Sequence, residues 1–206
     1  PIMKNAHEKL SKRNGDASFQ DLVAKGYVKE AIVNYIALLG WNPGDNREKM
    51  SLSEMIEAFS LEGLHKSPSI FDEPKLRWLS GEYIRAMSAE EFAAAALPFL
   101  EKSKAYGKFD TAALLRLVQP RVEIFGEIPE KLDFLAEYGA FDAALYGNKK
   151  MKTDETVARQ VLPAAEEVLR ALPVFANAEI YAALVALAQE RGWKNGQVLW
   201  LSLIHI

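Results

Sequence analysis

The sequence predicts a mainly α-helical protein, and two observations carry that prediction. Serine is followed three residues later by glutamate at Ser51 and Glu54 and again at Ser88 and Glu91, which is the capping-box pattern that starts many helices. After these signals the apolar residues recur at helical spacing, whereas the alternation typical of strands is scarce.

The expected helices follow one another with short breaks, many of them marked by glycine or proline. Their ranges are 18–26, 29–39, 51–59, 73–86, 88–100, 110–118, 129–138, 153–172 and 177–191. Pro120 requires a bend or a restart after residue 118, and Pro163 predicts a kink in the long helix around it. The best strand candidates are residues 68–71 and the loop near residues 7–14.

The helix at 73–86 has a clear inward face. Its spacing places four side chains toward the core: Leu76, Leu79, Tyr83 and Ile84. Trp78, which lies five positions before Tyr83 on this helix, is also assigned to the core. Residues 146–152 have no apolar periodicity and form the best candidate linker.

Composition excludes several classes of protein. The chain has 206 residues and no cysteine, so disulfides, cysteine-bound zinc and thiol catalysis are ruled out. The three histidines are isolated, and we therefore expect no metal site. No apolar run is long enough to cross a bilayer and no signal peptide is visible, so we expect a cytoplasmic protein without a membrane partner.

The net charge of −3 argues against a general nucleic-acid-binding protein, but the basic residues are unevenly placed. Three stretches are locally basic: 1–13, 102–121 and 147–152. Basic surfaces on an acidic protein suit a selective RNA-binding protein, because they hold phosphates without general adhesion.

The most informative segment is 9–13, which reads Lys-Leu-Ser-Lys-Arg and is followed by Gly15. It resembles the KMSKS loop of class I aminoacyl-tRNA synthetases, in the KLSKR form typical of glutamyl-tRNA synthetases. Further stretches resemble that family in the same order: EAIVNYIALLGW (30–41), KSPSIFD (66–72), KLRWLSGEYIR (75–85), QPR (119–121), IPEK (128–131) and GQV (196–198). The resemblance covers the chain from about residue 1 to Trp200, and a collinear series is more specific than any single motif.

The resemblance implies a ligase of protein biosynthesis that uses ATP to attach glutamate to its tRNA through a glutamyl-adenylate. By this resemblance the ATP contacts are Lys9, Leu10, Ser11, Lys12 and Arg13. Lys12 is the main catalytic lysine and Lys9 assists, since an ammonium group stabilises the charge that develops on the departing pyrophosphate. ATP is a substrate, Mg²⁺ is expected in the parent enzyme, and the protein is expected to be a monomer.

The resemblance also implies tRNA contacts. Arg121 would read an anticodon base, the third one, C36, because a guanidinium can bond and stack on an exposed base. The inner side of the tRNA stem would be contacted by Lys75, Arg77 and Arg85. At position 119 the chain has glutamine where the family commonly has arginine.

The expected domains are helical after a short first segment. Their ranges are 1–17 (end of a catalytic domain with the loop), 18–88 (stem-contact domain), 89–147 (first anticodon-binding subdomain) and 148–200 (second subdomain, incomplete). Residues 201–206 depart from the family and are set aside as a candidate non-native tail. No histidine lies in a HIGH-like motif, so this part alone is expected to be inactive.

Two other interpretations stay open. One is an RNA-binding helical module without catalysis, and the other is a helical adaptor for proteins. Arg121 has an alternative as well, an ordinary ion pair with Glu123 or Glu127. The sequence leaves open whether the parent charges only glutamate tRNA or also glutamine tRNA.

Overall fold

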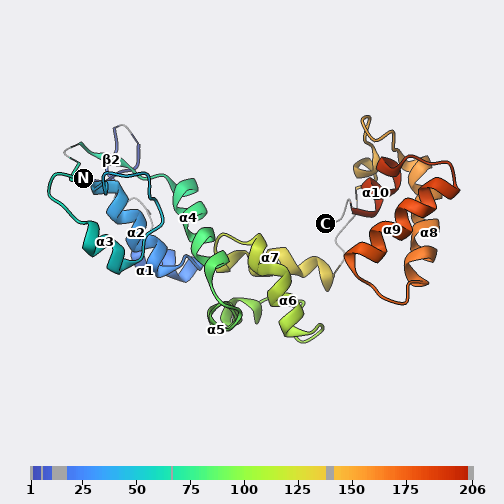
Figure 1. The fold of residues 1–206 in the computed structure, drawn as a ribbon, viewed down its shortest axis with the longest axis horizontal. Coiled ribbons are helices and arrows are strands. Elements are labelled where there is room, and N and C mark those ends of the chain that lie inside the picture. The colour runs from blue at the N-terminus through green and yellow to red at the C-terminus, as the bar shows by residue number, and fades with distance from the viewer. Residues whose placement is uncertain (1, 6, 11–17, 66, 138–141, 204–206) are drawn as a thin grey trace. The chain divides into compact units, whose positions relative to one another are not determined.

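The computed structural model describes residues 2–5, 7–10, 18–65, 67–137 and 142–203, and it confirms the mainly α-helical prediction (Figure 1). The chain forms two compact units, unit 1 (Pro1–Gly139) and unit 2 (Ala140–Ile206). Each unit has a hydrophobic core of its own.

Unit 1 is built from short helices joined by turns. The helices are α1 (Phe19–Lys25), α2 (Lys29–Gly40), α3 (Leu52–Ala58), α4 (Glu73–Ala86), α5 (Ala89–Leu100), α6 (Thr111–Val118) and α7 (Ile128–Leu132). The described residues of this unit also form the 3-10 turns η2 (Gln119–Arg121), η3 (Phe125–Glu127) and η4 (Asp133–Leu135). Helices α1, α3 and α5 begin at serines that close capping boxes with an acidic residue three positions on, which explains why these chain segments start helices where they do.

One apolar core runs through unit 1 from Leu22 in α1 to Leu132 in α7. Helix α4 contributes to it with the predicted inward residues Leu76, Leu79 and Ile84, all fully buried. The core therefore continues across residue 88, where the sequence suggested the end of one domain and the beginning of the next.

A two-stranded parallel sheet closes one end of unit 1. Strand β1 (Ile2–Met3) pairs with β2 (Ser69–Ile70), with Ile2 opposite Ser69. Strand β2 lies within the predicted range 68–71, whereas β1 was not anticipated because two residues are too short for a periodic pattern.

Unit 2 consists of η5 (Ala143–Tyr146), α8 (Glu155–Arg170), α9 (Asn177–Glu190) and α10 (Asn195–Leu203). The three α-helices pack on one another around buried Val161, Leu184 and Leu187. Helix α10 was not predicted. Its Leu201 is fully buried, so the beginning of the segment set aside as a tail takes part in this core.

Three structural expectations for single segments were wrong. Trp78 is 40% exposed because it lies about 200° around α4 from the buried Leu76. The helix expected to reach residue 138 gives way to a 3-10 turn at Asp133, whose carboxylate accepts hydrogen bonds from the Ser103 hydroxyl and the Lys104 N–H. The expected linker at 146–152 is a closed turn between η5 and α8.

Candidate nucleic-acid interface

The start of the basic loop is anchored to the small sheet. Lys9 forms an antiparallel bridge with Met3, and the Leu10 N–H donates to the Ile2 carbonyl oxygen at 3.1 Å. Lys9 is exposed, so its ammonium group is available to a ligand. The remaining loop residues of the prediction, Ser11, Lys12 and Arg13, lie outside the described residues.

Arg121 lies at the end of η2, the turn with which the chain restarts at Pro120 as predicted. Its side chain is exposed, and Nη1 donates a hydrogen bond to the Leu117 carbonyl oxygen at 2.5 Å. No ion pair involves it among the described residues. Its positive charge is therefore free to meet an anionic or polarisable ligand.

Arg77 is held in a cluster of charges that the sequence did not suggest. Its Nε donates to Glu123 at 3.2 Å, and its Nη2 donates to Glu127. The other carboxylate oxygen of Glu127 accepts the Glu123 N–H at 2.8 Å. The alternative pairing of Arg121 with Glu123 or Glu127 is thus wrong, because both carboxylates are paired with Arg77.

The same cluster determines the charge of Glu127. Burial alone would raise the pKa of its carboxyl group. The Glu123 N–H and the Arg77 guanidinium outweigh burial and hold that pKa below its ordinary value. Glu127 is therefore an anion at neutral pH and keeps Arg77 in place.

Gln119, two residues before Arg121, binds the start of this segment to α4. Its side-chain amide donates to the carbonyl oxygens of Ile84 at 3.1 Å and Met87 at 3.0 Å, at the C-terminal end of α4. The last carbonyls of a helix and its cap have few backbone donors, and the Ile84 oxygen otherwise accepts the Met87 N–H at 3.2 Å, so the Gln119 amide adds hydrogen bonds at this end of α4. An amide that binds backbone carbonyls explains how glutamine serves at a position where arginine was expected.

The two other predicted stem-contact residues have acidic partners on the surface. Lys75 pairs with Glu48 at 2.7 Å, and Arg85 pairs with Glu82 at 2.7 Å. Both pairs are exposed, and such pairs contribute little stability. Lys75, Arg77 and Arg85 all lie on α4, but the structure does not bring their charged groups together at one point.

A close backbone contact joins α1 to the segment after Arg121. The Phe125 N–H donates to the Gly26 carbonyl oxygen at 2.9 Å. A Cβ at Gly26 would lie 2.4 Å from the Gly126 nitrogen, and a Cβ at Gly126 would lie 2.3 Å from the Lys25 oxygen. Only glycine on both sides permits this approach.

Tyr27 follows Gly26 in the chain, and its hydroxyl is buried beside Glu73. Burial first, and then the hydrogen bond to Glu73 at 3.0 Å, raises the pKa of its hydroxyl to about 12 from 10.0. The pKa of Tyr27 is higher in the folded state than in the unfolded state. The protonated hydroxyl therefore contributes fully to the unfolding free energy below pH 10, and this contribution is lost as the pH rises toward 12.

We expect ionisation of Tyr27 to lower the unfolding free energy of unit 1 by roughly 2–3 kcal/mol between about pH 9 and about pH 12. Urea unfolding at the two ends of this range would measure the loss. Tyr27→Phe should lose less, whereas Tyr106→Phe, at an exposed tyrosine of the same unit, should behave like the unmodified protein. An equal alkaline loss in both variants would contradict the expectation.

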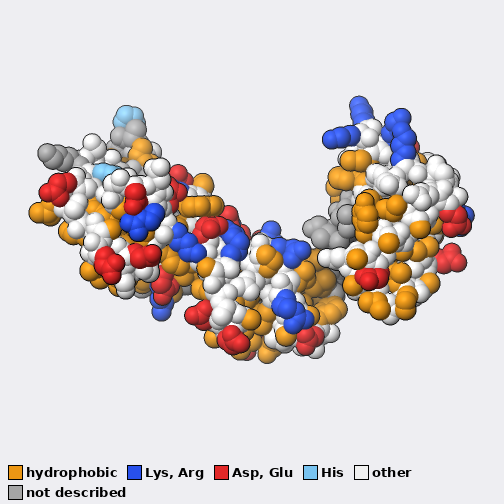
Figure 2. Space-filling view, viewed as in Figure 1, with side chains coloured by type: hydrophobic (Ala, Val, Ile, Leu, Met, Phe, Trp, Pro, Cys, Tyr) orange, Lys and Arg blue, Asp and Glu red, His pale blue; other side chains and the backbone are white. Residues whose placement is uncertain are grey.

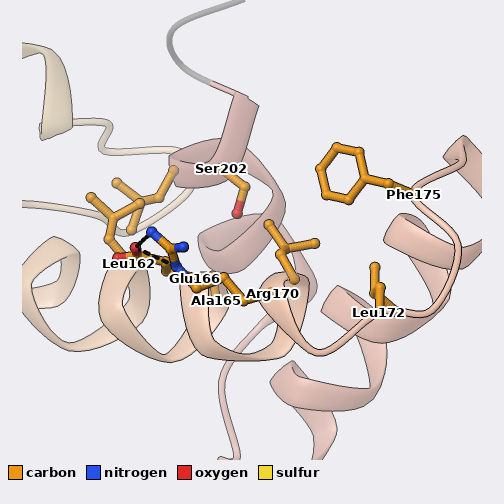
Figure 3. A pocket seen from close by; sticks show the side chains of 9 residues that line it. Leu162, Ala165, Glu166, Arg170, Leu172, Phe175 and Ser202 are labelled. Atoms are coloured by element: carbon orange, nitrogen blue, oxygen red, sulfur yellow. Dashed lines mark hydrogen bonds and ion pairs between the residues drawn. The ribbon is translucent and has the colours of Figure 1, made fainter.

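Unit 2 has a mainly apolar cavity of about 650 Å³ beside α8 and α10 (Figure 3). Leu162, Leu172 and Phe175 line it, and the charges of Glu166 and Arg170 neutralise each other at 2.7 Å on one side. Neither the lining nor the ion pair selects a particular ligand, so we assign no function to this cavity.

The described residues carry neither a membrane span nor a cluster of metal ligands. None of the helices they form is both long and apolar enough to span a membrane. Nor do the described residues bring together three histidine, aspartate or glutamate side chains that could hold a metal ion.

Comparison with known proteins identifies the class. The family model described as "Anticodon binding domain" matches residues 91–202, and the model for the catalytic domain of class I tRNA synthetases (E and Q) matches residues 1–78. The helical fold and these two matches define part of a class I tRNA synthetase.

Individual relatives narrow the class. Glutamate–tRNA ligase of Clostridium novyi is 47% identical over 203 residues, covering 97% of this chain and 42% of that protein. The same ligase of Clostridium acetobutylicum is 45% identical over 206 residues, covering 97% and 41%. The chain belongs to the glutamate–tRNA ligase family, of which it matches a C-terminal part, and it spans about 41–42% of the length of these relatives.

Solved structures agree with this assignment. A glutamate–tRNA ligase from Elizabethkingia meningosepticum, crystallised with its amino acid, has a TM-score of 0.73 and 27% identity, covering 99% of this chain and 44% of that one. The enzyme from Elizabethkingia anophelis has a TM-score of 0.72 and 26% identity, covering 98% and 43%.

Proposed function

We propose that this chain is the tRNA-binding part of an enzyme that attaches glutamate to tRNA. Membership of the family supports the reaction, and the Arg121 segment supports the role in recognition. The observation that carries the proposal is the state of Arg121: it is exposed, without an acidic partner among the described residues, and lies within the range matched by the anticodon-binding model. A guanidinium in this state can hydrogen-bond and stack on an unpaired base, and we assign it base 36 of the anticodon.

The basic loop would act in the first half-reaction, in which glutamate attacks ATP and pyrophosphate leaves. Negative charge grows on the β- and γ-phosphates as the bond breaks, and a preplaced ammonium stabilises that charge more in the transition state than before it. We assign this role to Lys12, with Lys9 assisting, and we assign the nucleotide contacts to the segment 9–13. Because the described residues contain no group of three His, Asp or Glu side chains that could hold a metal ion, we assign no Mg²⁺ ligand among them.

The stem contacts are divided between two kinds of residue. Lys75 and Arg85 have exposed acidic partners and can exchange them for tRNA phosphates at little cost. Arg77 is engaged by two carboxylates, and we assign it the task of positioning the Arg121 segment. The division into a stem-contact domain (18–88) and two anticodon-binding subdomains (89–147 and 148–200) is part of the proposal, as is a cytoplasmic location suited to translation.

The test is binding of a glutamate-tRNA transcript beside the same transcript with base 36 changed. We expect the unmodified chain to prefer the first, and Arg121→Ala to lose that preference by about 1–3 kcal/mol, or roughly 5- to 150-fold. Arg116→Ala is the matched control, because it removes an exposed cation from α6 nearby. A preference that survives in Arg121→Ala would contradict the assignment of Arg121.

A further inference from the structure

Four lysines lie together at one end of unit 2. Lys149, Lys150 and Lys152 belong to the turn between η5 and α8, and Lys194 lies just before α10. Figure 2 shows Lys and Arg side chains gathered at the end of unit 2 where Figure 1 draws this turn. We call these four residues the lysine turn. They serve neither the ATP loop nor the Arg121 segment.

The turn is a fixed structure. Asn148 and Thr153 exchange backbone hydrogen bonds of 3.0 and 3.1 Å across its base. Lys152 has a positive φ of 56°, the left-handed conformation that lets a chain reverse within a few residues.

Helix α10 holds the turn beside Lys194. The Gln197 amide donates to the Lys152 carbonyl oxygen at 3.0 Å, while its own oxygen accepts the Lys194 N–H at 3.0 Å. A Cβ at Gly196 would lie 3.0 Å from the Met151 sulfur, so the turn packs directly on this helix. One glutamine side chain thereby links the two parts of the chain that carry the lysines.

Acids do not neutralise the lysine turn. No ion pair involves any of its four lysines among the described residues. Asp154 follows the turn directly, but its carboxylate accepts the Val157 N–H at 2.8 Å and caps α8. Glu155 pairs with Arg159 at 2.6 Å. The lysines therefore present concentrated positive charge at a place of fixed geometry.

We propose that the lysine turn binds the phosphate backbone of the anticodon loop of tRNA, without regard to base identity. Lysine suits this task because its ammonium is a point charge that contacts phosphate oxygens without reading base edges. The inference rests on the proposed function, since the turn lies within residues 91–202, the range of the anticodon-binding match. It assigns to unit 2 a positioning contact that complements base reading by Arg121.

The test compares two double variants of the full chain that remove the same charge. Lys149→Gln with Lys150→Gln removes two lysines of the turn and leaves the left-handed Lys152 unchanged. Arg159→Gln with Arg170→Gln removes two exposed cations that α8 already pairs with glutamate. Affinity for both base-36 transcripts is measured by fluorescence anisotropy at several salt concentrations.

Neutralising phosphates releases bound cations, and the slope of log affinity against log salt grows by about 0.7 for each contact to a single strand. We expect the lysine variant to lose about 1.4 from the steepness of this slope and to weaken binding of both transcripts equally. Its preference for base 36 should stay unchanged. The arginine variant should keep the slope of the unmodified chain.

The outcomes separate this inference from the function on which it rests. Equal slopes for the two double variants would overturn the lysine turn while leaving base reading intact. A reduced salt slope in the lysine variant, together with no preference for either transcript in the unmodified chain, would support the lysine turn and overturn the role of Arg121. Absence of binding to both transcripts would overturn both proposals.

Discussion

Replacing Gly26 with alanine is expected to lower the unfolding free energy of unit 1 by about 4 kcal/mol. The backbone φ of 96° costs a residue with a Cβ about 1–2 kcal/mol. The new Cβ would also lie 2.4 Å from the Gly126 nitrogen and 2.9 Å from the Phe125 nitrogen. Both are backbone atoms that no side-chain rotation can clear, and overpacking of this kind adds about 1–3 kcal/mol.

The matched control separates the conformational cost from the clash. Gly107 in the same unit has a φ of 76°, but nothing lies within 4 Å of a Cβ built there. Gly107→Ala should therefore cost only about 1–2 kcal/mol. Urea unfolding would measure both, with amide hydrogen exchange resolved along the chain to distinguish unit 1 from unit 2. If Gly26→Ala costs no more than Gly107→Ala, the tight junction does not exist.

The second large effect is expected from Arg77→Ala, which leaves Glu123 and Glu127 without their cationic partner. Fully buried pairs lose about 3–5 kcal/mol in this way, and exposed pairs lose about 1 kcal/mol or less. The side chains of Arg77 and Glu127 are 31% and 17% exposed, so we expect an intermediate loss of about 2 kcal/mol. Because Glu127 also binds the Glu123 backbone, the segment that carries Arg121 should loosen.

This loosening has a readout that simple destabilisation would not give. At a temperature where the variant is still folded, Arg77→Ala should weaken the preference for base 36 although Arg121 is intact. Arg85→Ala is the control on the same helix, since it breaks an exposed pair and should change stability by no more than about 0.5 kcal/mol. Unchanged base preference in Arg77→Ala would show that the charge cluster stabilises unit 1 without positioning Arg121.

The helices that could be predicted are those whose first residues carry a local capping signal. A serine or aspartate cap, with an apolar stripe behind it, needs no information from elsewhere in the chain. Helix α10 was missed because it begins at Asn195 and Gly196 without such a cap, and its stability comes from burial of residues such as Leu201 against α8 and α9. Helix α7 was drawn too long because contacts of Asp133 with a turn 29–30 residues away compete with the helix.

The family was predictable from the sequence, whereas the pairing of charges around the proposed site residues was not. The acids that pair with Arg77 are Glu123 and Glu127, which follow it by 46 and 50 residues, so sequence spacing could not predict the pairing. Glu123 and Glu127 are close to Arg121 in the sequence, which suggested them as its partners. In the structure both of them pair with Arg77. One signal was visible: glutamine at position 119, an unusual choice that the carbonyls at the end of α4 now explain.

The continuity of the core across residue 88 has a consequence for how such enzymes can be recombined. Gln119 is bonded to the end of α4, Glu127 to its middle, and Phe125 to the chain at the end of α1. A chimera that exchanged residues 89–147 alone between two relatives would transfer Arg121 with Gln119, Glu127 and Phe125. It would leave behind their partners, which lie on α4 and at the end of α1. We expect a chimera to transfer specificity for base 36 only when α1, α4 and the Arg121 segment are all taken from the same relative.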